Sequence, residues 1–529
     1  MQPATIVQWE GLVMGCQFIQ HELRPRMIQR TNRNMVITTN LFYTYLTYLL
    51  ISMNFPKDIF LKLVYYLVCP LLLLSYLLEP FTSDVRIYLG AAKVTALTPG
   101  FPMNLDSVWE SRFVGHRFLY YILNLLDPFT GWMYSIWMKF IVSVVTIVIL
   151  YYFSKRISER MQVPIHYPFV LGYLGLFAVN NLIIFSAEYH AVVIGMLILT
   201  LLLDTRKLSW QISGLLILPL LLMKGLPVLI VLVVMLAVVM LVPDYRSRFY
   251  SALISLPVVG VVVLAVVLYF PHFISDIFLL TRLGHLNHLS VIQIIESFFY
   301  WGIGVIGFAP LIIVSVFVSF LLLSVVTKDH VRDIKVLVAM WLVAAVYTVI
   351  ISEFFYYHYY LMLIPALLTI CYFLKIVSSH WLAFVSIIVL VLVIYAGVVS
   401  GWSVGLAFKG YAHWSERESS AADIISRYDV LSQPVTLYLN DGEAAYYMST
   451  KSACRYVGSL PPIWNLSGTD TYWEMRNCSL EYTGKYVVVF PLWVDLNVTT
   501  HSELSDKINT EYTKVYSNYW DVYQRKDTI

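Results

Sequence analysis

The sequence has little charge for its length. Only 13% of its 529 residues are Asp, Glu, Lys or Arg, against roughly 25% in an average soluble domain. Hydrophobic residues make up 59% of the chain, too large a share for a surface that faces water throughout. The net charge of +3 gives no indication of a nucleic-acid partner. These shortages exclude a wholly soluble protein and predict an α-helical membrane protein that crosses the bilayer many times.

Cysteine is also scarce, with five residues in the whole chain. Cys69 and Cys371 lie in apolar runs, where a small buried side chain is the ordinary role of cysteine. Cys454 and Cys478 lie in the more polar last quarter, where a disulfide would form if that part faces an oxidising compartment. Sequence separation alone does not bring two Cα atoms within bonding range, so a disulfide and two free thiols remain alternatives.

Eleven apolar runs are long enough to span a bilayer, whose core of about 30 Å takes roughly 20 helical residues. The runs fall at 59–78, 134–154, 165–182, 187–203, 208–223, 226–242, 250–270, 301–326, 336–353, 356–376 and 381–402. The connections at 183–186 and 224–225 are short, and a kinked single helix is the alternative at each.

Basic residues mark one side of this arrangement. Nearly all the positive charge of the short connections lies at Lys155, Arg156 and Arg160, at Arg206 and Lys207, at Arg246 and Arg248, at Lys328, Arg332 and Lys335, and at Lys375. These connections share one side in the count of spans, and the positive-inside rule makes that side cytoplasmic. The loops 79–133 and 271–300 and the segment after Trp402 are then outside, and the plasma membrane is the expected location.

Three regions follow from this pattern. Residues 1–58 form a basic N-terminal segment, cytosolic or interfacial, and residues 59–402 form the transmembrane domain. Residues 403–529 change character. Their short apolar segments 434–440, 485–494 and 514–525 predict strands between polar, helix-compatible stretches. Three N-x-S/T sequons, at Asn465, Asn477 and Asn497, agree with a small α/β domain outside the cytoplasm.

The external loop 79–133 carries an unusual mixture of side chains. Its two stretches of helical periodicity, 84–97 and 108–126, each show apolar residues beside a polar face. Such helices are expected to lie flat on a membrane surface. Asp84 comes soon after the first span, where a carboxylate is a functional candidate because burying charge is costly. Capping of a helix by Asp84 is the alternative.

A site at the outer membrane face can be assembled from this loop. A carboxylate such as Asp84 takes the proton of an attacking hydroxyl. Cations such as Arg112 and Arg117 hold a phosphate as it leaves, and an aromatic ring such as Tyr88 stacks on a sugar or an isoprenoid chain. An ion pair within the loop, between Glu110 and Arg112, is the competing interpretation.

Three further polar residues lie near the outer ends of predicted spans: Glu188, Lys224 and His358. The alternative for Lys224 is a side chain that extends to the interface from an apolar helix. For His358, within the sequence YYHYY, the alternative is an aromatic belt at the interface.

Sequence motifs in this order resemble those of a known superfamily. The segment SDVRIYLGAAKV at 83–94 resembles the start of the first external loop of GT-C superfamily integral membrane glycosyltransferases. The segment 187–236, which begins AEYHAVVIGMLIL, and FFYYHYYLMLIPALL at 354–368 are similar to spans of polyprenol-phosphate-mannose-dependent mannosyltransferases. The resemblance covers about residues 59–402 in order, spacing and topology.

The resemblance implies an inverting transfer of a mannose-like sugar from a polyprenyl (dolichyl) phosphate donor to a glycolipid or glycan outside the cytoplasm. It implies that Asp84 is the general base and that Lys224, His358 and Arg112 bind the donor phosphate. The remaining candidates, Tyr88, Glu110, Glu188 and Arg117, are assigned to substrate binding.

Two departures from the superfamily bear on the function. No acidic doublet follows the first span, so no cofactor is expected and the need for a divalent metal stays open. No Trp-Trp-Asp motif followed by Tyr-Gly occurs, which argues against an oligosaccharyltransferase. The alternatives to a glycosyltransferase are a secondary transporter or flippase of lipid-linked sugars and an O-antigen ligase-like polymerising enzyme.

Overall fold

The structure is a computed structural model. It describes residues 57–78, 83–106, 114–125, 131–178, 186–223, 227–275, 292, 330–351, 360–376, 415–433, 435–439, 442–448, 450–455, 470–490 and 502–528. The chain divides into two compact units, Met1–Leu63 and Val64–Ile529, and the features below belong to the second. The predicted basic N-terminal segment, up to residue 56, and the predicted spans 301–326 and 381–402 lie outside the described residues.

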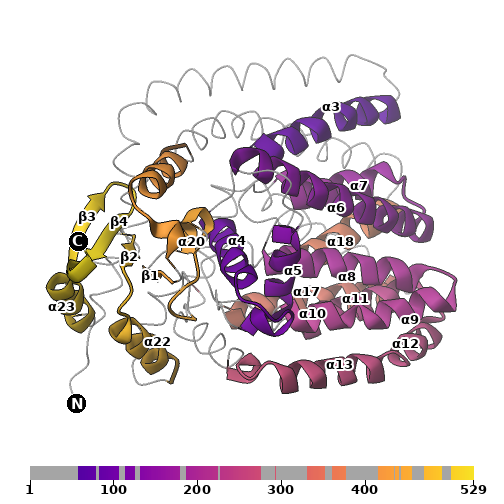
Figure 1. Cartoon of the computed structure of the whole chain (residues 1–529). Coiled ribbons are helices and arrows are strands. Elements are labelled where there is room, and N and C mark those ends of the chain that lie inside the picture. The colour runs from indigo at the N-terminus through magenta and orange to yellow at the C-terminus, as the bar shows by residue number, and fades with distance from the viewer. Residues whose placement is uncertain are drawn as a thin grey trace. The chain divides into compact units, whose positions relative to one another are not determined.

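Helices occupy the described parts of the predicted spans (Figure 1). They are α3 (Lys57–Leu78), α6 (Gly131–Met161), α7 (His166–Tyr173) with the π-helical turn η2 (Leu174–Ala178), α8 (Ala187–Leu203), α9 (Lys207–Leu215), α10 (Ile217–Met223), α11 (Pro227–Leu241), α12 (Tyr245–Leu253), α13 (Leu256–Tyr269), α17 (Val331–Ile351) and α18 (Leu363–Ile376).

Two helices in the described part of the chain are long and apolar enough to cross a membrane, Ile136–Met161 and Tyr245–Tyr269. Shorter apolar helices cover Cys69–Leu78, Ala187–Leu203, Lys207–Met223, Val228–Leu241 and Tyr360–Ile376. The count of eleven spans therefore stays a prediction.

Helix α8 lies among α6, α9 and α11, and α11 also packs against α17. A small residue permits the close approach of α8 and α11, because a Cβ added at Gly195 would lie 2.7 Å from Cγ2 of Ile230. Small residues at such contacts let apolar helices pack without a gap.

The basic residues at the helix ends gather around Asp204, which follows α8. Its carboxylate accepts hydrogen bonds from Arg156 Nη2 at 2.9 Å, Arg206 Nε at 2.9 Å and Ser209 Oγ at 2.6 Å. Arg248 donates to the main-chain oxygens of Leu202 and Asp204. Burial raises the pKa of Asp204, but the hydrogen bonds from Ser209, Thr205 and Arg206 outweigh it and lower the pKa to about 2.

Two further arginines donate hydrogen bonds to main-chain oxygens at the same ends of the helices. Arg160 donates to the oxygen of Leu203 at 3.3 Å, and Arg332 donates to the oxygen of Met240 at 3.5 Å. The five arginines placed by these hydrogen bonds, which were predicted to share one side of the membrane, thus lie at neighbouring helix ends.

The external loop forms α4 (Ser83–Ala96), the 3-10 turn η1 (Met103–Asp106) and α5 (Val114–Leu125). Both predicted helical stretches are therefore helical where the structure describes them. The expectation that one polar face of α4 is exposed to water is wrong, whereas its orientation relative to the membrane stays a prediction. Between Val85 and Thr95 only Ile87 and Lys93 are partly exposed, and all other residues are buried. The reason is that α4 packs against both α5 and the C-terminal domain.

The C-terminal domain contains a four-stranded sheet in the order β1-β2-β4-β3. The strands are β1 (Leu437–Leu439), β2 (Tyr486–Val489), β3 (Tyr512–Ser517) and β4 (Asp521–Arg525). β1 runs parallel to β2, and β4 runs antiparallel to both β2 and β3. The predicted strand 514–525 is a hairpin instead of one strand, because Ser517 and Asn518 lie at a turn, where such residues are favoured.

Alternate residues of the strands face two different cores, as the two-residue period of a strand requires. On one face, Leu437 and Val487 pack with helices α22 (Asp470–Glu481) and α23 (Ser502–Glu511). Cys454 and Cys478 lie in or against this core and form a disulfide, with their Cα atoms 5.8 Å apart. Asn477, the sequon residue within the described part, is exposed on α22.

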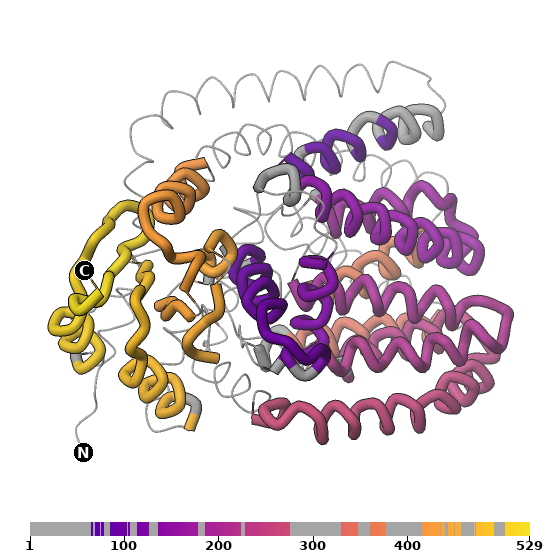
Figure 2. The backbone as a smooth tube through the Cα atoms, in the orientation of Figure 1, coloured from indigo at the N-terminus to yellow at the C-terminus, as the bar shows by residue number. Residues whose placement is uncertain are grey.

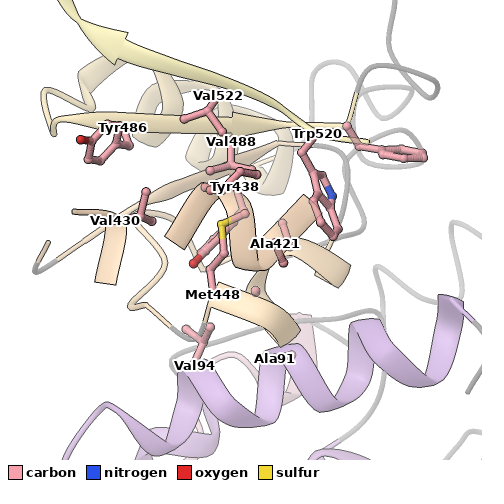
Figure 3. Packing of buried hydrophobic residues seen from close by; sticks show 14 residues of the cluster. Ala91, Val94, Ala421, Val430, Tyr438, Met448, Tyr486, Val488, Trp520 and Val522 are labelled. Atoms are coloured by element: carbon pink, nitrogen blue, oxygen red, sulfur yellow. The ribbon is translucent and has the colours of Figure 1, made fainter. Parts of the chain in front are cut away.

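The other face of the sheet packs against a helix from the external loop. Tyr438 and Val488 share a core with Trp520, with the helical residues 415–427 and with α20 (Gly442–Met448). Ala91 and Val94 of α4 complete this core (Figure 3). The C-terminal domain and α4 therefore bury one continuous hydrophobic core.

We expect Asp204→Asn to lower stability by about 1 to 3 kcal/mol, because it weakens hydrogen bonds between charged groups in a buried position. The carboxylate is ionised in the folded protein above its pKa of about 2, below its ordinary value of about 3.9. Its contribution is present above that ordinary value and is lost as the pH falls toward 2.

Thermal unfolding in detergent between pH 7 and pH 3 measures this. The difference in melting temperature between wild type and variant should shrink below about pH 4. Asp244→Asn is the matched control, because the Asp244 side chain is 54% exposed and pairs with Arg248. A control as destabilising as Asp204→Asn would contradict the assignment.

Candidate active site

One face of α4 carries two cations that bind the C-terminal domain. Arg86 Nη2 donates to Oε1 of Glu443 at 2.8 Å, and the two side chains are only 4% and 2% exposed. Two helical turns further along the same face, Lys93 Nζ donates to the main-chain oxygen of Tyr446 at 3.0 Å. The same Nζ lies 4.1 Å from the centre of the Tyr446 ring. Figure 2 shows the indigo trace of α4 beside the orange trace of α20. The charges that follow the first span therefore attach α4 to the domain.

Glu443 is bound by a second arginine of its own domain. Arg417 Nη1 lies 3.2 Å from Oε2 of Glu443, and its guanidinium lies 4.6 Å from the ring centre of Tyr519. Burial raises the pKa of the Glu443 carboxyl above its ordinary value, and the neighbouring Arg86 opposes that rise.

The opposite face of α4 packs on α5 through aromatic rings. Tyr88 is 5.1 Å from His116 and 5.2 Å from Tyr120, measured between ring centres and in edge-on geometry. Val85 and Leu89 of α4 and Met138 of α6 belong to the same core. This contact fixes α4 relative to the apolar helices.

Beyond His116 the site continues to the start of α8. His116 and His190 have ring centres 6.3 Å apart. Glu188, in the first turn of α8, is 4% exposed and interacts electrostatically with His190 and with Tyr360, which lies three residues before the start of α18. We call His116, Glu188, His190 and Tyr360 the buried polar cluster.

The buried polar cluster combines groups that bind hydroxyls and carry protons. A carboxylate, two imidazoles and a phenol supply both hydrogen-bond donors and acceptors. Its place at the start of α8 is opposite to Asp204, because the 17 residues of α8 span roughly 25 Å at 1.5 Å per residue. The cluster and the basic helix ends thus lie at opposite ends of α8.

The structure places the predicted site residues as follows. Asp84 is the second residue of α4, and its side chain lies outside the described part. Tyr88 packs against His116, and Arg117 Nη1 donates to the oxygen of Leu105 at 2.9 Å. Glu188 belongs to the buried polar cluster. Their roles in binding substrate stay predictions.

Four predicted residues, Glu110, Arg112, Lys224 and His358, lie outside the described residues. Their chain neighbours lie near the cluster. Leu222, two residues before Lys224, is so close to α5 that a Cβ on Gly115 would lie 2.6 Å from its Cβ. Tyr360 itself is two residues after His358.

Sequence analysis missed three features of this site: the Arg86–Glu443 pair, the pairing of His116 with His190, and Lys139. Lys139 of α6 is 1% exposed and donates to the oxygen of Tyr76, in the last turn of α3, at 3.0 Å. A signal for it is present in the sequence. An α-helix would bond the Tyr76 oxygen to the N–H of residue 80, but Pro80 has no N–H. The lysine supplies the missing donor.

Within the described residues, no group of three or more His, Cys, Asp or Glu side chains is placed to hold a metal ion.

No family model and no curated protein sequence matches the chain. Solved structures do match. The chain shares the fold of ArnT. The apo crystal structure of ArnT from Cupriavidus metallidurans has a TM-score of 0.54 and 13% identity, over 88% of this chain and 97% of that one. The crystal structure of the same protein bound to undecaprenyl phosphate has a TM-score of 0.56 and 12% identity over the same shares.

The likeness supports the predicted fold, which is mostly helical with a small sheet near the C-terminus. At 12–13% identity it concerns the fold, and the sugar and the acceptor do not follow from it.

We expect Lys139→Met to destabilise the protein by about 1 to 3 kcal/mol, because the buried oxygen of Tyr76 loses its donor. Pro80→Ala supplies an N–H at the position that pairs with the Tyr76 oxygen in a regular α-helix. The loss in melting temperature caused by Lys139→Met should therefore be smaller in the Pro80→Ala background. Equal losses in both backgrounds would contradict the role of Lys139 as the substitute donor, and the four-variant cycle measures the coupling directly.

Proposed function

We propose that the protein is an integral membrane glycosyltransferase that takes its sugar from a polyprenyl-phosphate donor. The observation that carries this proposal is the ArnT-like fold over 88% of the chain, together with the crystal structure of ArnT bound to undecaprenyl phosphate. In this proposal the donor's phosphate and sugar lie at the end of the fold formed by α4, α5 and the start of α8, where the predicted site residues Tyr88, Arg117 and Glu188 are found.

The proposed chemistry uses one carboxylate. Asp84 accepts the proton of an acceptor hydroxyl as that oxygen attacks the anomeric carbon of the donor sugar. The bond from that carbon to the phosphate oxygen breaks, and polyprenyl phosphate leaves with the electron pair. Lys224, His358 and Arg112 stabilise the leaving phosphate. A single displacement inverts the configuration at the anomeric carbon.

The finer features of the proposal rest on the sequence resemblance. They are a mannose-like sugar, a glycolipid or glycan as acceptor, and a multi-pass arrangement in the plasma membrane with the site and the C-terminal domain outside. Two structural features support the sidedness. The buried polar cluster lies at the end of α8 opposite to the basic helix ends, and Asp84 is in the first turn of α4, whose Tyr88 packs against His116 of that cluster.

Purified protein in vesicles with a labelled polyprenyl-phosphate sugar tests the proposal. Transfer of the label to an added lipid or glycan acceptor supports it, and the anomeric configuration of the product, read by nuclear magnetic resonance, tests inversion. Movement of the label across the vesicle without transfer would instead show a flippase or transporter. Formation of a polymer would show an O-antigen ligase-like enzyme.

Asp84→Asn should lower the transfer rate by at least about 100-fold with little change in melting temperature, because an amide cannot accept the proton. Asp106→Asn makes the same chemical change elsewhere in the external segment and should leave the rate near that of wild type. An Asp84→Asn enzyme that retains more than about a tenth of the wild-type rate is incompatible with Asp84 as the base.

Lys224→Ala and His358→Ala should each weaken donor binding or turnover by about 1.5 to 3 kcal/mol, the contribution of a hydrogen bond to a charged group. Donor-concentration kinetics measure this. Lys375→Ala, at the basic helix ends, is the matched control. Wild-type kinetics in the first two variants would assign Lys224 to the interface and His358 to an aromatic belt.

A further inference from the structure

The C-terminal domain holds the helix that begins with Asp84. Arg86, two positions after Asp84, forms a buried ion pair with Glu443, and Lys93 binds the main chain of the same short helix, α20. Glu443 lies in the first turn of α20, after the carboxyl end of β1. The contact therefore connects the start of α4 to the edge of the sheet.

We propose that Glu443 is a positioning residue for sugar transfer, which through Arg86 fixes the helix that carries Asp84. This inference rests on the proposed function, and it assigns a part in the reaction to a residue of the C-terminal domain.

Two features make α4 rigid relative to the sheet. Ala91 and Val94 are buried in the same core as Tyr438 and Val488 (Figure 3), so α4 cannot slide or turn without opening that core. At the other end, the charge-assisted hydrogen bond from Arg86 Nη2 to Glu443 Oε1, 2.8 Å long, holds the start of α4. The carboxylate of Glu443 is in turn held by Arg417 at 3.2 Å.

The effect on catalysis follows from the geometry of proton transfer. A general base acts within hydrogen-bonding reach of the hydroxyl, and a displacement of about 1 Å costs on the order of 100-fold in rate. Loss of the ion pair lets the start of α4 move. It does not change Lys224 or His358 directly, because along the chain Lys224 follows α10 and His358 comes before α18, so neither residue is part of α4. The turnover number should therefore fall while the KM for the donor changes little.

Glu443→Gln should lower kcat by about 10- to 100-fold and leave the donor KM within about twofold. Arg86→Lys keeps the positive charge, so the buried charges stay balanced, but it loses the planar guanidinium with its several N–H donors. We therefore expect a kcat between those of wild type and Glu443→Gln. The double variant Arg86→Met with Glu443→Gln should be no slower than the slower single variant, because both changes remove the same interaction.

Asp521→Asn is the matched control for simple destabilisation. Asp521 is also a buried carboxylate of the C-terminal domain, 6% exposed, and it accepts hydrogen bonds from Lys514 at 2.7 Å and Ser517 at 2.6 Å. Both partners belong to β3, so the change does not touch α4. A lowered melting temperature with wild-type kcat is the expected result.

The outcomes separate the two proposals. Wild-type protein that transfers no sugar would overturn the proposed function and this inference with it. Active wild type with an unchanged kcat in Glu443→Gln overturns this inference alone. An equal fall of kcat in Glu443→Gln and Asp521→Asn also overturns it, because the domain would then contribute only stability. If Glu443→Gln does not fold, wild-type kcat in Arg86→Lys has the same meaning.

Discussion

The contact between α4 and the C-terminal domain is centred on the buried ion pair of Arg86 with Glu443. Two charges taken out of water are expensive, and removal of one partner of such a pair typically costs about 3 to 5 kcal/mol, since the other charge stays buried. If only one of these two parts were folded, its charge would lack the partner that compensates for its burial. α4 and the C-terminal domain therefore stabilise each other. On one side of α4, Ala91 and Val94 pack in the core of the sheet, and on the other side Tyr88 packs against the aromatic rings of α5.

Features governed by local composition could be predicted from the sequence. The run 187–203 coincides with α8, because no charged residue lies between Glu188 in its first turn and Asp204 after its end. The grouping of Arg156 and Arg206 follows from their positions at helix ends. Hydropathy does not show breaks within an apolar run, so the predicted span 208–223 is two helices, α9 and α10, that meet at Leu216. The two amphipathic stretches of the external loop were likewise predicted as helices.

Features that depend on distant partners could not be predicted. The segment that begins with Ser83 has the spacing of a surface helix, and the residue that buries its arginine is 357 positions further along the chain. Nothing in the sequence around His116 or His190 indicates a shared site, because the two rings come close only when the fold brings α5 near the start of α8. Pro80 indicates locally that the main-chain oxygen of Tyr76 lacks its usual helical N–H donor. It does not indicate that Lys139 is the residue that donates to this oxygen instead.

The long separation between Arg86 and Glu443 has a consequence for biosynthesis. During synthesis at about 5 to 20 residues per second, α4 emerges roughly 20 to 70 seconds before the segment 357 residues later that completes its core. Throughout that interval Ala91, Val94 and an unneutralised arginine are without their final environment. Until that segment is made, α4 lacks the core in which Ala91 and Val94 are buried, and a chain that stops before residue 437 cannot form this core.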